Sequence, residues 1–145
     1  MIVRECITRL ARQFERVPYL WGGAGPNQDG TFGFDCSGFV IFQLRPFTLL
    51  AERGDWTAQQ LSQMFRRTTS PEPGDLVLYG ASERKVTHVM MFLGGDQCIG
   101  AVGGDRRTRT PADARGRGAM VKTAAIGYRK DFLGYRNILA AAEAR

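Results

Sequence analysis

The chain has 145 residues, of which 43% are hydrophobic and 23% charged, as is ordinary for a globular domain with its own core. No apolar run approaches the length of a transmembrane helix, so the sequence predicts no membrane span. The formal net charge is +6, and arginine outnumbers lysine 17 to 3. This charge favours an anionic partner, but nucleic acid is not predicted because no RNA- or DNA-binding motif accompanies it.

Three cysteines and one histidine limit the chemistry that the chain can carry. Cys6, Cys36 and Cys98 do not indicate a disulfide framework, and their spacing does not match a zinc site. We therefore expect neither a metal nor another cofactor. We find no internal repeat and treat residues 1–145 as a single domain.

The N-terminal segment, residues 2–16, has the pattern of an amphipathic helix that Pro18 ends. We expect Cys6 on its buried face and Arg4 elsewhere on the cylinder. Residues 18–34 follow with five glycines and few signals of regular structure. This composition predicts a loop whose backbone can approach a ligand.

Cys36 lies in the stretch on which the functional interpretation of the chain depends. The apolar run at residues 39–42 predicts the buried face of a helix, which ends near Arg45 because Pro46 cannot continue it comfortably. Cys36 then stands in the first turn, where unpaired N–H groups and the helix dipole favour an anion. We expect its thiol to lose a proton more easily than usual. The alternative is a small buried hydrophobe, the common fate of a free cysteine.

A short helix and several strands are predicted downstream. Thr57 fits the N-cap of a helix that ends at Phe65, and Asp75 fits a structural role in the turn before its strand. Strand patterns cover residues 75–79, the run that opens at His88, and residues 97–102, 119–126 and 130–138. The tail from Leu139 is alanine-rich, and either a helical or a frayed end fits it.

His88 is the only histidine, so the hypothesis that Cys36 is a nucleophile depends on it. A Cys–His pair needs the imidazole to take the thiol proton and later to protonate the leaving amine. The two residues are 52 positions apart and meet only if the fold brings helix and strand together. The alternative for a lone histidine on a strand is a structural role.

Four blocks of sequence resemble, in order and spacing, the NlpC-type cell-wall cysteine peptidases. The blocks are residues 18–23 (PYLWGG), 35–40 (DCSGFV), 73–77 (PGDLV) and 88–95 (HVMMFLGG). The resemblance covers roughly residues 2–103. It implies an α+β, papain-like domain in which N-terminal helices pack on an antiparallel sheet of about five strands.

The resemblance also implies an activity and a site. Members of the family hydrolyse peptidoglycan stem peptides, most often between γ-D-glutamate and a diamino acid. By this resemblance Cys36 is the nucleophile and His88 the base, while Tyr19, Asp35 and Ser37 line the substrate cleft. The alternative for Tyr19 is a core aromatic, and the alternative for Asp35 is the N-cap of the following helix.

One position departs from the family pattern. Relatives commonly have a second histidine on the strand after His88, and it orients the catalytic ring. Here that position is Gly100, which has no side chain to offer. A backbone carbonyl, a water or another residue must orient His88 instead, and Gln97 and Asp105 are the nearby candidates.

Residues 103–118 differ in kind from the rest, with five arginines and no apolar periodicity, and we expect an exposed, mobile loop. Such a loop can hold anionic cell wall, contact a neighbour in an assembly, or simply be solvated. The chain start, residues 1–6, lacks the apolar core of a signal peptide. Together these features resemble phage-borne members of the family, which are virion-associated or released by lysis.

Two functions therefore remain open from the sequence. The first is a cysteine peptidase that hydrolyses peptidoglycan, and its resemblance to phage-borne members suggests a tail-associated enzyme. The second is a structural tail component that keeps the fold with weak or no activity and contacts phage tail proteins through residues 103–118. Gly100 and the basic loop motivate the second.

Overall fold

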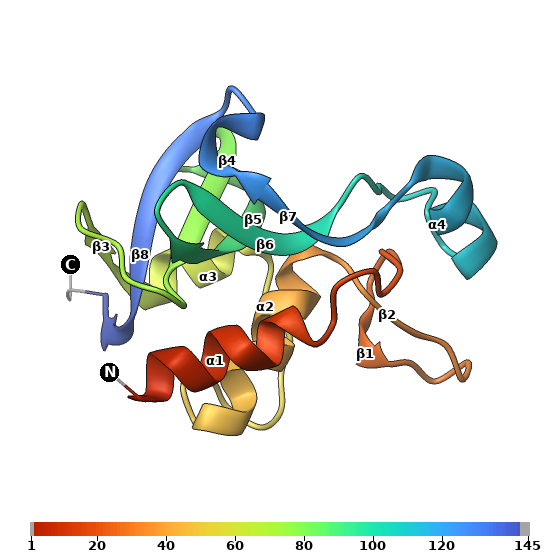
Figure 1. Cartoon of the computed structure of the whole chain (residues 1–145), viewed down its shortest axis with the longest axis horizontal. Helices are drawn as coiled ribbons and strands as arrows, with labels where there is room; N and C mark the ends of the chain where they lie inside the picture. The colour runs from red at the N-terminus through yellow and green to blue at the C-terminus, as the bar shows by residue number, and fades with distance from the viewer. Residues whose placement is uncertain (1, 143–145) are drawn as a thin grey trace.

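In the computed structural model, which describes residues 2–142, a helical N-terminal part is followed by a sheet (Figure 1). The helices are α1 (Ile2–Arg12), α2 (Cys36–Leu44), α3 (Ala58–Met64) and α4 (Pro111–Arg117), with 3-10 turns η1 (Arg45–Phe47) and η2 (Ile126–Tyr128). The strands of a short hairpin are β1 (Ala24–Pro26) and β2 (Phe32–Phe34). The main sheet contains β3 (Phe65–Thr68), β4 (Leu76–Ser82), β5 (Lys85–Gly94), β6 (Gln97–Val102), β7 (Met120–Ala125) and β8 (Phe132–Ala141).

The main sheet has six strands in the order β3-β8-β4-β5-β6-β7, and every neighbouring pair is antiparallel. The α+β prediction, with N-terminal helices on an antiparallel sheet, is therefore confirmed, with one strand more than the expected five. The extra strand is β3, which follows α3 directly and pairs with β8. The helix predicted to end at Phe65 ends at Met64, and Phe65 is the first residue of β3.

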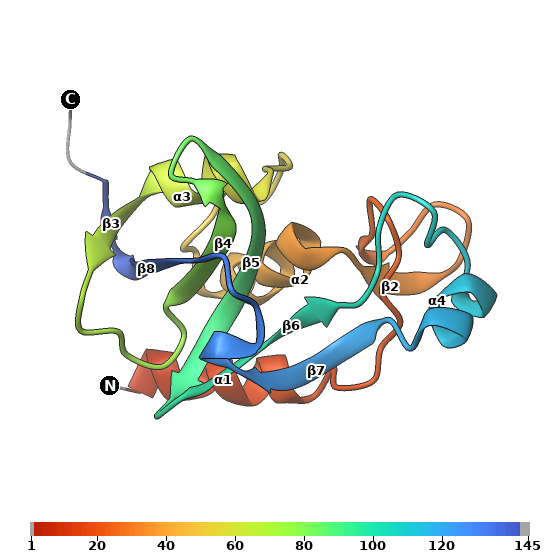
Figure 2. The same cartoon turned by 90° about the horizontal axis from the view of Figure 1, so that it is seen from above.

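The helices cover one face of the sheet. Along β4, successive side chains alternate between the core under the helices and a smaller cluster on the other face. Leu76 and Leu78 are fully buried in the larger core beneath α2 and α3, whereas Val77 and Tyr79 are fully buried in a smaller cluster on the other face. In both views α4 and the β1–β2 hairpin lie at one end of the molecule, away from β3 (Figures 1 and 2). None of the helices within residues 2–142 is long and apolar enough to cross a membrane.

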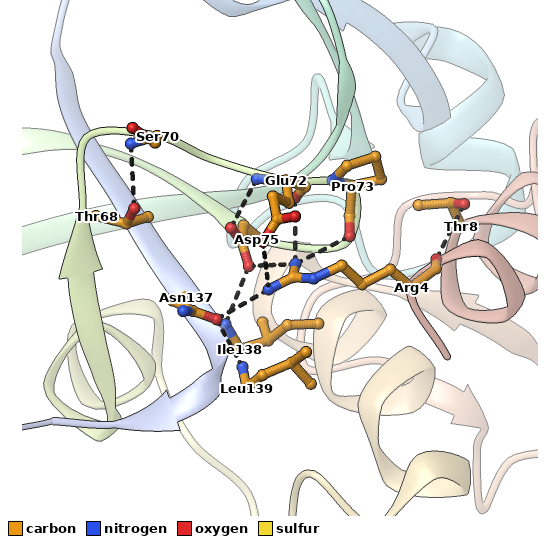
Figure 3. A network of polar contacts seen from close by, with 10 residues as sticks. All are labelled: Arg4, Thr8, Thr68, Ser70, Glu72, Pro73, Asp75, Asn137, Ile138 and Leu139. Carbon is orange, nitrogen blue, oxygen red and sulfur yellow. Dashed lines mark hydrogen bonds and ion pairs between the residues drawn. The ribbon is translucent and has the colours of Figure 1, made fainter. Parts of the chain in front are cut away.

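A buried ion pair joins α1 to the sheet (Figure 3). The Arg4 guanidinium donates to Asp75 Oδ1 at 2.7 Å and to Asn137 Oδ1 at 2.9 Å. Asp75 also accepts from the N–H groups of Glu72 and Ile138, so it holds the turn before β4 as predicted. The expected sides of α1 were wrong for two residues, because Arg4 is buried by this network and Cys6 is exposed.

Several chain segments differ in secondary structure from the expectation. The helix expected over 2–16 ends at Arg12, and the N–H of Arg16, whose φ is +75°, donates to the carbonyl of Val121 at 2.7 Å. Part of the expected glycine-rich loop forms β1 and β2. The tail from Leu139 is neither helical nor frayed up to Ala141, because β8 continues there and Phe65 pairs with Ala141.

The arginine-rich segment 103–118 was expected to be an irregular loop, but it contains α4. Thr110 and Asp113 form a capping box at the start of this helix, and Gly118 ends it in the left-handed conformation with φ of +64°. Thr108 is fully buried, and its carbonyl accepts from the N–H of Trp21 at 2.7 Å. The exposure of its five arginines, 106, 107, 109, 115 and 117, agrees with the prediction.

Candidate active site

The structure brings Cys36 to the strand that carries His88. Cys36 is the first residue of α2, and its Sγ lies 4.0 Å from the carbonyl oxygen of Thr87. The backbone N–H of Val89 also interacts with this sulfur. Thr87 and Val89 flank His88 on β5, so the sulfur lies against the two peptide units beside the histidine.

This approach requires an open strand edge and close backbone packing. The paired residues of β5 and β6 begin only at Met91 and Ile99, which leaves the part of β5 near His88 unpaired on that side. A Cβ placed at Gly38 would collide with the carbonyl oxygen of Gly23. The glycines of the first two family-like blocks therefore allow the start of α2 to pack against the loop before β1.

Asp35 is the N-cap of α2, which confirms the capping alternative. Its Oδ1 accepts from the N–H of Gly38 at 2.7 Å, and its Oδ2 accepts from the N–H of Gly22 at 3.2 Å. The Ser37 hydroxyl donates to Asp35 Oδ1 at 3.3 Å. The carboxylate thus ties the glycine-rich loop to the helix beside Cys36. Burial raises the pKa of this carboxyl, although the bond from Gly38 acts in the opposite direction.

Tyr19 belongs both to the core and to the surroundings of Cys36. Tyr19 is 5% exposed. A Cβ at Gly104 would collide with the Tyr19 ring, so the ring packs directly against that glycine. Burial raises the pKa of the Tyr19 hydroxyl, and electrostatic interaction with Cys36, Asp35 and Asp105 raises it further. The hydroxyl therefore lies within electrostatic range of the nucleophile candidate.

The charge state of the Cys–His pair differs from the expectation. Burial, followed by the neighbouring carboxylate of Asp35, raises the pKa of the Cys36 thiol to about 11. The N–H groups of Ser37 and Cys36 do lower this pKa, as the helix start predicts, but the effect of burial is larger. Burial and then the charge of Arg129 lower the pKa of His88 to about 3. The resting pair is a neutral thiol and a neutral imidazole, so the expected low-pKa thiolate was wrong.

The ring of His88 is surrounded by residues that the sequence analysis missed. The hydroxyl of Tyr128 lies 2.8 Å from His88 Nε2, and the ring of Tyr79 lies 5.6 Å from the imidazole between centroids. Arg129 stands over the Tyr79 ring and forms a two-point ion pair with Asp131 at 2.9 and 2.7 Å. Tyr79 lies on β4, whereas Tyr128, Arg129 and Asp131 come from η2 and the turn after it, which contain no recognisable motif.

The candidates for orienting His88 are placed elsewhere. Asp105 accepts from the N–H of Arg107 and pairs with Arg117, while Gln97 is exposed at the start of β6. Gly100 is buried on β6, and a Cβ there would lie 2.5 Å from the sulfur of Met90. Met90 therefore fills the space in which a side chain at position 100 would lie. Within residues 2–142, no three His, Cys, Asp or Glu side chains gather as a metal site requires.

Comparison with known proteins agrees with this architecture. Residues 16–124 match the NlpC/P60 family. The chain belongs to this family. The bifunctional muramidase/DL-endopeptidase CwlT of Bacillus subtilis is 32% identical over 94 residues, which cover 62% of this chain and 26% of CwlT. The γ-D-glutamyl-L-lysine dipeptidyl-peptidase of the same organism is 31% identical over 99 residues, which cover 66% of this chain and 31% of that protein.

A solved NlpC/P60 structure shows the same fold. The peptidoglycan hydrolase RipB of Mycobacterium tuberculosis superposes with a TM-score of 0.71 at 25% identity, covering 94% of this chain and 64% of RipB. The two curated relatives are much longer than the segment they share with this chain, which spans about a third of their length or less.

Proposed function

We propose that this chain is a cysteine peptidase that hydrolyses peptidoglycan stem peptides. One observation carries the proposal: the sulfur of Cys36, at the start of α2, lies against the peptide units that flank His88. The thiol that we assign as nucleophile thus lies against the backbone of β5, the strand that carries His88, the residue that we assign as base. Membership of the NlpC/P60 family and relatives named as peptidoglycan endopeptidases support the choice of substrate.

The neutral resting pair determines the order of proton transfer. Because the pKa of Cys36 is about 11 and that of His88 about 3, His88 takes the thiol proton as the sulfur bonds to the carbonyl carbon. We assign the backbone N–H of Cys36, at the start of α2, as a donor to the developing oxyanion. The C–N bond then breaks, and His88 returns the proton to the leaving amine. Water, deprotonated by His88, hydrolyses the thioester and restores the thiol.

The bond that we assign is the one between γ-D-glutamate and the diamino acid. The relative named as a γ-D-glutamyl-L-lysine dipeptidyl-peptidase supports this assignment. We assign the carboxylate of Asp35 to the amino group of the stem peptide, and Tyr19 and Ser37 are its neighbours. Since Asp35 also caps α2, its replacement by asparagine separates recognition from capping by comparing turnover with thermal stability.

Digestion of defined muropeptides followed by mass spectrometry tests the activity and the bond together. We expect products with a new amine on the diamino acid, and we expect Cys36→Ala to abolish them with little change in thermal stability. Cys6→Ala is the matched control, because Cys6 is an exposed thiol on α1. A Cys36→Ala protein that cuts as fast as the parent would falsify the assignment of the nucleophile.

The setting that we propose is a phage tail, and the exposed arginines of segment 103–118 motivate it. Serine at Arg106, Arg107 and Arg109 is expected to block incorporation into tail particles while muropeptide cleavage by the isolated chain continues. If these arginines hold cell wall instead, the same variant binds sedimented peptidoglycan more weakly and with less dependence on salt. A parent that enters particles but cleaves nothing would favour the structural tail component.

A further inference from the structure

The position that orients the catalytic histidine in relatives is closed in this chain. Gly100 has no side chain, and the sulfur of Met90 would lie 2.5 Å from a Cβ built there. Met90 is itself fully buried. No side chain can enter from position 100 without a change at Met90, so His88 needs a partner from another element.

The connection between β7 and β8 supplies such a partner. In the sheet, β4, β5 and β6 separate these two strands, so the chain must pass over them to continue from β7 to β8. The passage contains η2, and the last residue of η2 is Tyr128. Its hydroxyl lies 2.8 Å from His88 Nε2.

We propose that Tyr128 is the positioning residue of His88, accepting a hydrogen bond from Nε2–H and so leaving the lone pair on Nδ1. The inference rests on the proposed peptidase function. Nδ1 is the ring nitrogen nearer the backbone, and the Cys36 sulfur lies against the backbone on both sides of His88. With Nε2 engaged by Tyr128, Nδ1 is the nitrogen that faces the thiol as a base.

The surroundings of Tyr128 hold its oxygen in place as an acceptor. The ring packs edge-on against Tyr79 with centroids 5.5 Å apart. The Arg129 side chain hydrogen-bonds to the Tyr128 hydroxyl, and a guanidinium can only donate. Tyr128 is 41% exposed, so its own proton can be donated to solvent while the oxygen accepts from both Arg129 and His88. When His88 becomes an imidazolium, the same oxygen still accepts from Nε2–H.

Because the chain has one histidine, nitrogen NMR of the imidazole reads this arrangement directly in an untagged protein. In the parent we expect Nε2 to be protonated and Nδ1 to carry the lone pair. Tyr128→Phe removes only the hydroxyl and is expected to give a mixture of tautomers. Tyr135→Phe is the matched control, because Tyr135 loses the same atom but packs against Phe92 and Phe132 instead. A parent protonated at Nδ1, or a tautomer unchanged by Tyr128→Phe, overturns the proposal.

Kinetics give a second, independent reading. We expect Tyr128→Phe to lower kcat about 10- to 100-fold, as loss of an orienting partner typically does, with KM nearly unchanged. Adding Met90→Gly and Gly100→His to this variant provides a histidine at the family position and is expected to recover part of kcat. An unchanged kcat in Tyr128→Phe overturns the proposal. If the parent cleaves no muropeptide but shows the expected tautomer, the proposed function fails and the positioning role stands.

Discussion

Two arginine–aspartate pairs of this protein have nearly the same geometry and different surroundings. Arg4 and Asp75 approach to 2.7 Å with side chains that are 5% and 2% exposed. Arg129 and Asp131 also approach to 2.7 Å, but each side chain is 35% exposed. The first pair joins residues 71 positions apart, whereas the second spans two positions within one turn.

The difference separates a structural role from an electrostatic one. The buried pair holds α1, the turn before β4 and β8 together, so the loss of either partner leaves a charge inside the protein. The partly exposed pair joins no distant segments, but it lies close enough to His88 to shift its pKa. Arg129 lowers the pKa of His88, and Asp131 raises it. The pair therefore adjusts the pKa of His88 while contributing little to the fold.

The largest expected effect comes from breaking the buried pair. Asp75→Asn removes the buried counter-ion of Arg4 and leaves only the exposed carboxylate of Glu72 at 3.6 Å, so we expect it to cost about 3–5 kcal/mol of unfolding free energy. Urea denaturation measures this loss. Asp131→Asn, the same replacement in the exposed pair, is the control. If both variants lose the same stability, burial does not distinguish the two pairs.

The sequence could predict contacts between residues that are close along the chain, but not contacts between distant segments. Residues 35–40 indicated an N-cap and a helix start, and both form because the cap depends on residues close in sequence: Asp35 accepts from the N–H of Gly38. Arg4 was misplaced because its partners lie on β8 and in the turn before β4, and no helical periodicity reports a buried cation.

Tyr128 was missed for a similar reason. Its contact with His88 exists only because the strand order carries η2 across the sheet, and the order of strands is not visible in their individual patterns. The charge state of Cys36 could not be predicted either. The helix start lowers the thiol pKa as expected, but the larger, opposing effect of burial depends on how α2 packs against β5.

A second prediction concerns stability at acid pH. His88 has a pKa of about 3 in the folded protein, below its usual 6.5, so the unfolded chain binds the proton more readily between these values. Stability is therefore expected to fall as the pH decreases from about 6.5 towards about 3. His88→Gln lacks this titration, so the difference in unfolding free energy between parent and variant changes across that window. A constant difference contradicts the assigned pKa.

The smallest loss of stability is expected from changes to the partly exposed Arg129–Asp131 pair, whose main effect is on the pKa of His88. Asp131→Asn removes the negative charge that raises the pKa of His88 and leaves Arg129, which lowers it. We expect a still lower His88 pKa and a slower peptidase reaction, with less than about 1 kcal/mol lost in stability because the pair is partly solvated.

Titration of the single imidazole by NMR measures the change, and Arg129→Gln is the opposing control. Removing the cation is expected to raise the pKa of His88, since burial then acts without the repulsion of a neighbouring positive charge. Opposite shifts in the two variants would show that charge is the cause, because loss of the ion pair is common to both. Shifts in the same direction would instead mean that the pair acts by holding the turn that carries Tyr128.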